Sequence, residues 1–193
     1  MGPVSTSGRN LQLEPYSPEN KAEVRAALNC DPTGWDLVAT SGQGRNFDGW
    51  WARAVNGLAQ GQAIPYAIRR RVDGRVVGVS SFLSIRPEHC GLEIGGTFLH
   101  PDVRAGAVNP EAKRLMLGHA FAAGALRVEL ITDLRNLRSQ AAIAKLGAIR
   151  EGVLRNHKVT WTGHVRDTVV FSITDLEWPA VRSRLDERLK AVA

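Results

Sequence analysis

The chain has 193 residues, 44% of them hydrophobic and 23% charged, and its formal net charge is +6. This length suits one domain with a buried core, and the ordinary composition excludes a fibrous protein and a largely disordered one. An Arg-rich surface accounts for most of the positive charge, so we do not expect a nucleic-acid partner on this ground.

The sequence contains no sign of a disulfide framework, a metal site or a membrane span. Its two cysteines, Cys30 and Cys90, lack metal-ligand spacing, and its histidines have no partner at such spacing. No apolar run reaches the length of about 18 residues that a membrane-spanning helix needs. We therefore expect a cytoplasmic protein with reduced thiols, no metal and no membrane contact.

The N-terminal part is predicted to begin with a loose, flexible terminus at residues 1–8. Alternating apolar and polar residues predict a strand at 9–13, and apolar residues at helical spacing predict helices at 18–28 and 47–59. The stretch 29–44 between the two helices is rich in Gly, Asp, Thr and Ser. It is predicted to be an irregular connection of the length that often has a function.

The middle of the chain is rich in β-forming residues. Runs at 64–71 and 75–84 are predicted to pair as a hairpin, because a Val-Asp-Gly turn joins them. Residues 91–99 are predicted to form the next strand, which contains two adjacent glycines, Gly95 and Gly96. Glycine weakens a strand, so the pair indicates either a bulge that only bends the sheet or a place where an extended ligand lies against exposed backbone.

Small residues lead from this strand into a helix predicted at 110–123. Asn109 is a favoured N-cap and Pro110 suits the first helical position, so the helix start is predicted at Asn109. Small residues ahead of a helix N-terminus, with Arg104 beside them, form a ready cradle for phosphate groups. Glu111 places a carboxylate in the first turn and opposes an anion there. A capped loop without a ligand is therefore the alternative interpretation.

A strand at 126–132 and a helix at 137–146 come next. Asn136 at the helix start is expected to be a plain N-cap, although Asn136 and Ser139, one turn apart on one face, could also donate to a ligand. Gly147 stands where a helix commonly ends in left-handed backbone.

Strands at 148–154 and 165–173 around a turn, and a helix at 176–190, complete the chain. Without an internal repeat or a linker, residues 9–190 are predicted to form a single domain. The expected fold class is α+β, with mixed α/β character, built on a central, mostly antiparallel twisted sheet of about seven strands flanked by helices.

Two motifs in this order are similar to those of a known family. The strand and loop carry the pattern Glu93-Ile94-x-x-Thr97-x-Leu99-x-Pro101-x-x-Arg104. The later helix carries the pattern Asn136-x-x-Ser139-x-x-Ala142-Ile143-x-Lys145-Leu146-Gly147-Ala148. They resemble motifs A and B of the GNAT (Gcn5-related) N-acetyltransferases in both separation and element order. The likeness covers residues 9–175, and the RimJ/RimL type of ribosomal-protein N-terminal acetyltransferase is the branch it most resembles.

The resemblance implies a GNAT-like fold, splayed open between the strands at 92–99 and 126–132, where acetyl-CoA would bind as co-substrate. The residues that it implies for the pantetheine, the diphosphate and the thiol are Thr97, Phe98, Leu99, Arg104, Ala105, Gly106, Ala107, Val108, Asn109, Asn136 and Ser139. It also implies an acceptor pocket shaped by Trp35, Asp36 and Trp50. Relatives often dimerise, so a homodimer is compatible with the resemblance.

The sequence departs from the family pattern at two places. The family loop reads Arg/Gln-x-x-Gly-x-Gly/Ala, but here Ala107 and Asn109 stand at the last two marked positions and Gly106 comes one place early. Ala107 can supply a backbone N–H but not the positive-φ freedom of Gly. The Tyr that many relatives place just after motif B is replaced by Ala148 and Ile149, which excludes a Tyr acid from that position.

The activity that the resemblance implies is transfer of an acetyl group from acetyl-CoA to a primary amine by direct attack in a ternary complex. The amine would belong to a protein N-terminus, such as that of a ribosomal protein, or to a small molecule. Glu93 is the candidate general base, acting through water with a pKa raised by burial. Ser139 is the candidate acid for the leaving thiolate, and a backbone N–H near Leu99 would stabilise the oxyanion.

Two other functions stay open at this stage. The substituted loop and the missing Tyr would suit an acyl-CoA-binding regulatory module without strong catalysis. The arginines around the hairpin turn, Arg69, Arg70, Arg71 and Arg75, would suit an RNA- or ribosome-binding protein. Such a run is more often a solvated hairpin edge, because charged edge strands prevent aggregation.

Overall fold

The computed structural model describes residues 2–191. Within them the strands are β1 (Thr6–Ser7), β2 (Leu11–Pro15), β3 (Ile64–Arg70), β4 (Val76–Arg86), β5 (Gly91–Leu99), β6 (Arg127–Asp133), β7 (Ile149–Val159) and β8 (Val165–Thr174). The α-helices are α1 (Lys21–Leu28), α2 (Phe47–Ala59), α3 (Val108–Ala122), α4 (Leu137–Ala144) and α5 (Trp178–Ala191). The strands form one sheet in the order β1-β2-β3-β4-β5-β6-β8-β7, antiparallel throughout except between β5 and β6. This confirms the predicted mixed class and mostly antiparallel sheet.

The strand β1 was not predicted, because it lies within residues 1–8, which the sequence pattern assigned to a loose terminus. Thr6 and Ser7 pair with Leu13 and Gln12, so that β1 covers the outer edge of β2. Arg71 adds a tie, because its guanidinium donates to the carbonyl of Gly8 at 2.9 Å. An open strand edge offers unpaired N–H and C=O groups, and a short polar segment can satisfy them without any apolar signal in its sequence.

The last hairpin is longer than predicted. β7 continues to Val159, whereas the sequence pattern ended that strand at 154. The pairing with β8 shifts register between Leu154 and Lys158, and Asn156 there has a φ of 51°. A bulge breaks the two-residue alternation by which a strand is recognised, so the second half of β7 was hidden from the pattern.

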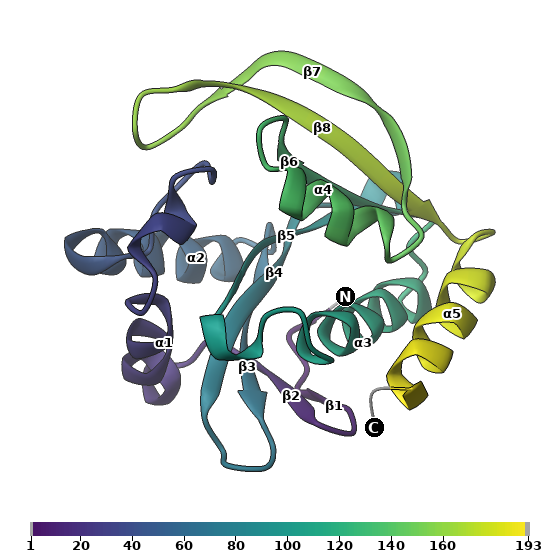
Figure 1. Ribbon diagram of the computed structural model, residues 1–193, viewed down its shortest axis with the longest axis horizontal. Helices are drawn as coiled ribbons and strands as arrows, with labels where there is room; N and C mark the ends of the chain where they lie inside the picture. Colours follow the sequence, from purple (N-terminus) through teal and green to yellow (C-terminus); the bar gives the residue numbers. More distant parts are fainter. Residues whose placement is uncertain (1, 192–193) are drawn as a thin grey trace.

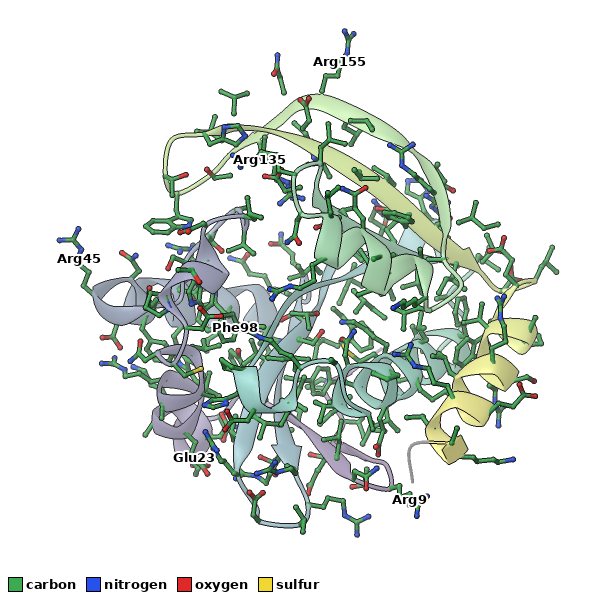
Figure 2. All side chains as sticks on the ribbon, viewed as in Figure 1. Arg9, Glu23, Arg45, Phe98, Arg135 and Arg155 are labelled. Atoms are coloured by element: carbon green, nitrogen blue, oxygen red, sulfur yellow. The ribbon has the colours of Figure 1, made fainter. Side chains whose placement is uncertain are left out.

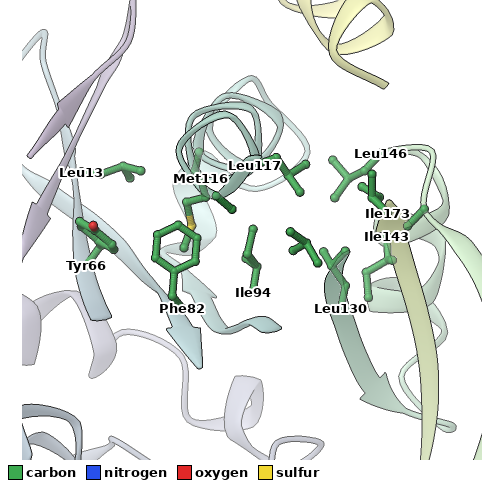
Figure 3. Close-up of a cluster of buried hydrophobic side chains, with 14 of the residues drawn as sticks. Leu13, Tyr66, Phe82, Ile94, Met116, Leu117, Leu130, Ile143, Leu146 and Ile173 are labelled. Carbon is green, nitrogen blue, oxygen red and sulfur yellow. The ribbon is translucent and has the colours of Figure 1, made fainter. Parts of the chain in front are cut away.

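Two apolar cores lie on opposite faces of the sheet. α1 and α2 cover one face, and α3, α4 and α5 cover the other (Figure 1). On the α3 face, Ile94 of β5 lies between Phe82 and Leu130 and close to Leu117 (Figure 3). This core therefore joins the two halves of the sheet. None of the helices within residues 2–191 combines the length and the apolar character needed to cross a membrane.

The arginines at the β3–β4 turn are largely neutralised by carboxylates. Arg69 pairs with Glu14 and with Glu23, each at 2.8 Å. Arg70 pairs with Asp73 of the turn. Because these cations already have anionic partners, the run favours the hairpin-edge interpretation over a nucleic-acid surface.

Candidate active site

The sheet opens between β5 and β6. These strands share only three residue pairs, from Gly91 with Arg127 to Glu93 with Glu129. Beyond Glu93 the rest of β5 has β4 on one side and no strand on the other. The predicted splay is therefore present, and it leaves backbone N–H and C=O groups of β5 open to an extended ligand.

Glu93 lies at the apex of this opening and is buried, with 8% of its surface exposed. Its neighbours Leu92 and Ile94 face the α3 core, so the Glu93 side chain projects from the opposite face. Burial raises the pKa of Glu93, and the like charge of Glu129 adds to the effect while Lys158 opposes it. A Cβ at residue 95 would collide with the Glu93 carboxylate, which explains Gly95.

The second glycine makes a bulge. Gly96 has a φ of 59°. The segment of β5 from Gly95 to Phe98 lies opposite the segment of β4 from Ser81 to Val79, so β5 contains one extra residue here. The extra residue reverses the alternation. As a result Thr97 faces α3, where its hydroxyl contacts Lys113, and Phe98 faces the other core. The glycine pair therefore does mark a bulge, and because the bulge also lines the opening, binding of an extended ligand there stays a prediction.

Lys113 of α3 is buried beneath the bulge with 5% of its surface exposed. Its Nζ donates to Ser80 Oγ at 2.9 Å and to Thr97 Oγ1 at 2.6 Å, and these two hydroxyls are 2.8 Å apart. No carboxylate joins this cluster among the described residues, and burial lowers the pKa of Lys113 to about 7. The three side chains fasten the bulge to α3.

The loop before α3 offers a group of unused backbone donors. The N–H groups of residues 105–109 have no backbone acceptor within residues 2–191. They lie just before α3 and in its first turn, and the dipole of this helix of 15 residues adds partial positive charge at this end. Gly106 has open space around it, with the Val103 carbonyl 3.7 Å from where a Cβ would lie. This donor set fits a diphosphate.

The backbone of this loop differs from the prediction in two ways. Ala105, and not position 107, takes the left-handed conformation, with a φ of 63°. Ala107 is the N-cap residue with a φ of −73°, so the helix begins at Val108 and Asn109 lies inside its first turn. The reason is packing, because Val108 is buried in the α3 core, and tertiary contacts override capping preferences.

Glu111 does not oppose an anion at the loop, because its carboxylate points to β2. It is 3% exposed and accepts hydrogen bonds from the Asn10 backbone and side chain, each at 2.8 Å, and from the Leu11 N–H at 3.3 Å. The carboxylate in the first turn therefore ties α3 to the edge of the sheet.

Arg104 and the aromatic residues form the wall next to the loop. The Arg104 guanidinium donates to the Leu99 carbonyl at 2.9 Å and to Asp31 at 2.5 Å. It also lies over the Phe98 ring, which stacks on Trp35 at 4.7 Å between centroids. Figure 2 shows Phe98 close to the centre of the molecule.

The start of α4 forms the opposite wall. Asn136 is its N-cap, and the side-chain oxygen accepts from the Ser139 N–H at 3.0 Å, as the default interpretation predicted. Both residues also line the opening. Gly147 has a φ of 96° just beyond the helix end, as its position indicated.

The opening is a cavity of about 390 Å³. The predicted site residues that line it are Trp35, Trp50, Glu93, Thr97, Phe98, Leu99, Arg104, Ala105, Asn109, Asn136 and Ser139. Gly106 and Ala107 are outside the lining and contribute only their place in the donor loop, and Val108 belongs to the core. Asp36 is exposed and does not line the cavity, because it follows the 3₁₀ turn Pro32–Trp35 on the outer side.

Four basic residues of the cavity wall were missed, namely Lys113, Arg138, Lys158 and Arg166. Lys113 is preceded by Ala112 and followed by Met116 and Leu117 on the buried side of α3, so its core-facing spacing was a usable signal. Lys158 and Arg166 line the cavity from the β7–β8 hairpin. Lys158 was missed because the pattern ended β7 before it, whereas Arg138 and Arg166 lie inside the predicted helix and strand, where no local signal marked them. No group of three or more His, Cys, Asp or Glu side chains within residues 2–191 could hold a metal ion.

A sequence model of the acetyltransferase (GNAT) domain matches residues 10–149. The chain belongs to the GNAT acetyltransferase family. As a member it is an acyltransferase, and acetyl-CoA is the co-substrate of the family. The donor loop, the splayed edge of β5 and the buried carboxylate all lie within the matched residues 10–149.

Solved structures agree with this assignment. A T. thermophilus protein provisionally classed as an acetyltransferase is 35% identical to this GNAT chain, with a TM-score of 0.85 over 98% of each chain. A GCN5-related N-acetyltransferase from Brucella melitensis is 25% identical, with a TM-score of 0.90 over 98% of this chain and 86% of its own. RimJ from Mycobacterium smegmatis in complex with CoA-disulfide is 20% identical, with a TM-score of 0.80 over 96% and 95%, and shares the fold. No curated protein matches the sequence.

Proposed function

We propose that this GNAT enzyme transfers the acetyl group of acetyl-CoA to a primary amine by direct attack while both substrates are bound. One observation carries the proposal: a buried carboxylate, Glu93, lies at the apex of a cavity whose other end is a loop of unused backbone donors. A base and an anion site at opposite ends of one cavity suit a proton-losing amine and a cofactor with a diphosphate. Bound acetyl-CoA would supply the electrophilic thioester carbonyl.

Within this proposal each residue has a defined task. Glu93 accepts the proton of the incoming ammonium group through water, and its raised pKa suits it to act as a base near neutral pH. Ser139 donates a proton to the departing thiolate. The backbone from Thr97 to Leu99 on the open side of β5 pairs with the pantetheine and supplies an N–H to the carbonyl oxygen, while the loop at residues 105–109 holds the diphosphate.

The acceptor is an amine of a protein N-terminus, such as that of a ribosomal protein, or of a small molecule. The fold shared with RimJ and the cavity walls of Trp35 and Trp50 support a pocket for a slender amine. Both cysteines are free thiols, which supports a cytoplasmic location.

The test is release of free thiol from acetyl-CoA by the purified enzyme with a panel of amines and N-terminal peptides. We expect release that depends on an amine, and a rise of the thermal unfolding midpoint when CoA is added. Stabilisation by CoA without release for any amine would assign the chain to a regulatory acyl-CoA-binding module. Absence of both effects at millimolar CoA would refute the proposal and its site.

A further inference from the structure

The cavity contains a buried arginine without a partner. Arg166 of β8 is 5% exposed, and its Nε and Nη2 atoms are buried with no hydrogen-bond partner among the described residues. Burial lowers the pKa of this guanidinium, while the nearby carboxylates of Asp133 and Glu93 act in the opposite direction without a hydrogen bond to it. A buried cation without a hydrogen-bonded partner lowers the stability of a fold, and an anionic ligand bound to it would relieve this cost.

A second cation stands directly opposite the first. Lys158 of β7 is the cross-strand partner of Arg166 in the hairpin, and both line the cavity. Like charges directly opposite each other in a sheet are destabilising. No ion pair of the described residues includes either side chain, and Asp133, the acid on the neighbouring strand β6, is already bound by Arg135 at 2.9 Å.

A third polar group on the same face is also unpartnered. Thr168, two residues along β8 from Arg166, is fully buried, and its hydroxyl has no partner among the described residues. Residues two apart on a strand project from the same face. Arg166 and Lys158 thus present unused donors to the cavity, which an acceptor-only group such as a carboxylate would satisfy, while Thr168 lies outside the cavity lining.

This region belongs to the acceptor end of the cavity. Lys158 and Arg166 both act on the charge of Glu93, so they lie near the reacting end. The diphosphate loop follows Leu99, six residues further along β5 and roughly 20 Å away by strand rise. The two cations are therefore separate from the donors that would hold the cofactor phosphates.

We infer that Arg166, assisted by Lys158, binds a carboxylate of the acceptor, so that the acceptor is an amine that also carries a carboxylate. The inference rests on the proposed function and narrows it. Polycationic acceptors such as polyamines are disfavoured, because they would bring further positive charge to an unpaired arginine and lysine. A free amino acid and a peptide N-terminus with a nearby acidic residue share the required chemistry.

The experiment compares acceptors that differ only in the carboxylate. Thiol release from acetyl-CoA is measured with free amino acids against their amides, and with Ala-Glu-Ala-amide against Ala-Gln-Ala-amide, to separate the two sources. One of the two pairs of acceptors should be acetylated by the wild type. Within that pair we expect kcat/KM to be about 10- to 100-fold higher for the compound that carries the carboxylate. In Arg166→Gln this preference should fall to near unity, and in Lys158→Gln to an intermediate value.

The matched control is Arg155→Gln, because Arg155 lies on the same hairpin but is exposed and points away from the molecule (Figure 2). It should keep the wild-type preference. The unfolding midpoint of Arg166→Gln should equal or exceed that of the wild type, since an unrelieved buried charge is removed. A lower midpoint with an unchanged preference would show a structural role and overturn the inference.

Failure of the inference is distinguishable from failure of the proposed function. Turnover that is equal with and without the carboxylate overturns the carboxylate site alone. If no amine releases thiol, the transfer proposal fails. The carboxylate site can still be tested by comparing the rise in unfolding midpoint of the CoA-loaded protein on addition of glutamate with the rise on addition of glutamine amide. Equal stabilisation by both compounds would then overturn it as well.

Discussion

At the scale of single residues, the environment of Glu93 determines what its carboxylate can do. The side chain is buried on the face of β5 opposite the α3 core, and Gly95 leaves the space into which the carboxylate folds. A carboxylate on an exposed strand would keep its ordinary pKa and would be a weak base at neutral pH. Burial raises the pKa of Glu93 and so makes it a better proton acceptor.

Replacing Glu93 by Gln is expected to lower kcat by about 10²- to 10⁴-fold while leaving CoA affinity unchanged. Because the folded-state pKa is raised, the neutral side chain stabilises the fold at low pH, and this contribution is lost as pH rises through that pKa. Glu93→Gln should therefore equal or exceed the wild type in unfolding midpoint at pH 7. Steady-state kinetics and thermal unfolding from pH 4 to 8 measure both effects, and a variant with full activity would exclude Glu93 as the base.

The contribution of Lys113 to the stability of the fold depends on pH in the opposite sense to that of Glu93. Its folded-state pKa is lowered to about 7 by burial, so between pH 7 and the ordinary lysine pKa the unfolded chain binds one more proton than the folded one. Stability of the wild type should rise with pH over this range, by up to about 1.4 kcal/mol per unit.

Lys113→Met has no ionisable group at this position, so its free energy of unfolding lacks this dependence on pH. The amount by which this free energy exceeds that of the wild type should be largest at pH 6 and smaller at pH 9. Chemical denaturation at several pH values measures the difference. The exposed Lys145→Met controls for the loss of one positive charge. A Lys113→Met difference that does not vary with pH would contradict the lowered pKa.

At the scale of elements, the position of α3 decides the geometry of the diphosphate loop. The helix is held at its first turn by Glu111, which accepts three hydrogen bonds from Asn10 and Leu11 of the N-terminal segment. It is held further along its length by Lys113 against the bulge of β5. These two attachments fix the helix N-terminus relative to the open strand edge.

Glu111→Ala is expected to destabilise the protein by about 1–3 kcal/mol, because it removes the acceptor of the buried Leu11 N–H and of two donors of Asn10. The exposed Glu187→Ala on α5 is the matched control and should change stability by less than about 0.5 kcal/mol. Denaturant unfolding measures both variants. Equal midpoints for the two would show that the Glu111 contacts do not stabilise the fold.

At the scale of the whole molecule, the cavity is closed by segments far apart in the sequence. The β7–β8 hairpin arches over α4 toward the connection between α1 and α2 (Figure 1). Just past β7, the Trp161 indole N–H donates to the Trp35 carbonyl at 2.8 Å, and the Trp161 backbone N–H donates to the Ala39 carbonyl at 3.0 Å. The cavity therefore has a wall made by residues 34–40 together with the β7–β8 hairpin.

Trp161→Phe removes the indole donor and keeps the backbone bond. We expect KM for the acceptor to rise by about 3- to 10-fold, since one neutral hydrogen bond is lost, with the CoA-dependent rise in unfolding midpoint unchanged. Val165→Thr, at an exposed position of the same hairpin, should leave both quantities unchanged. A Trp161→Phe variant with the wild-type KM would show that the hairpin tip does not shape the acceptor site.

Local patterning along the chain was enough to predict several features correctly. Apolar periods placed α2 at its observed bounds, the glycine pair marked the bulge, and Asn136 and Gly147 marked the two ends of α4. The spacing of the two motifs was enough to indicate the family. These features depend on residues that are close together in the sequence, so the local pattern of a single sequence is enough to predict them.

Other features depend on residues distant in the sequence and became visible only in the folded molecule. Packing of Val108 set the start of α3, the edge of β2 ordered Thr6 and Ser7, and the turn at Pro32–Trp35 left Asp36 outside the cavity. Register between β7 and β8 brought Lys158 opposite Arg166. Burial, register and charge pairing depend on contacts between residues far apart in the sequence, so local sequence patterns cannot predict them.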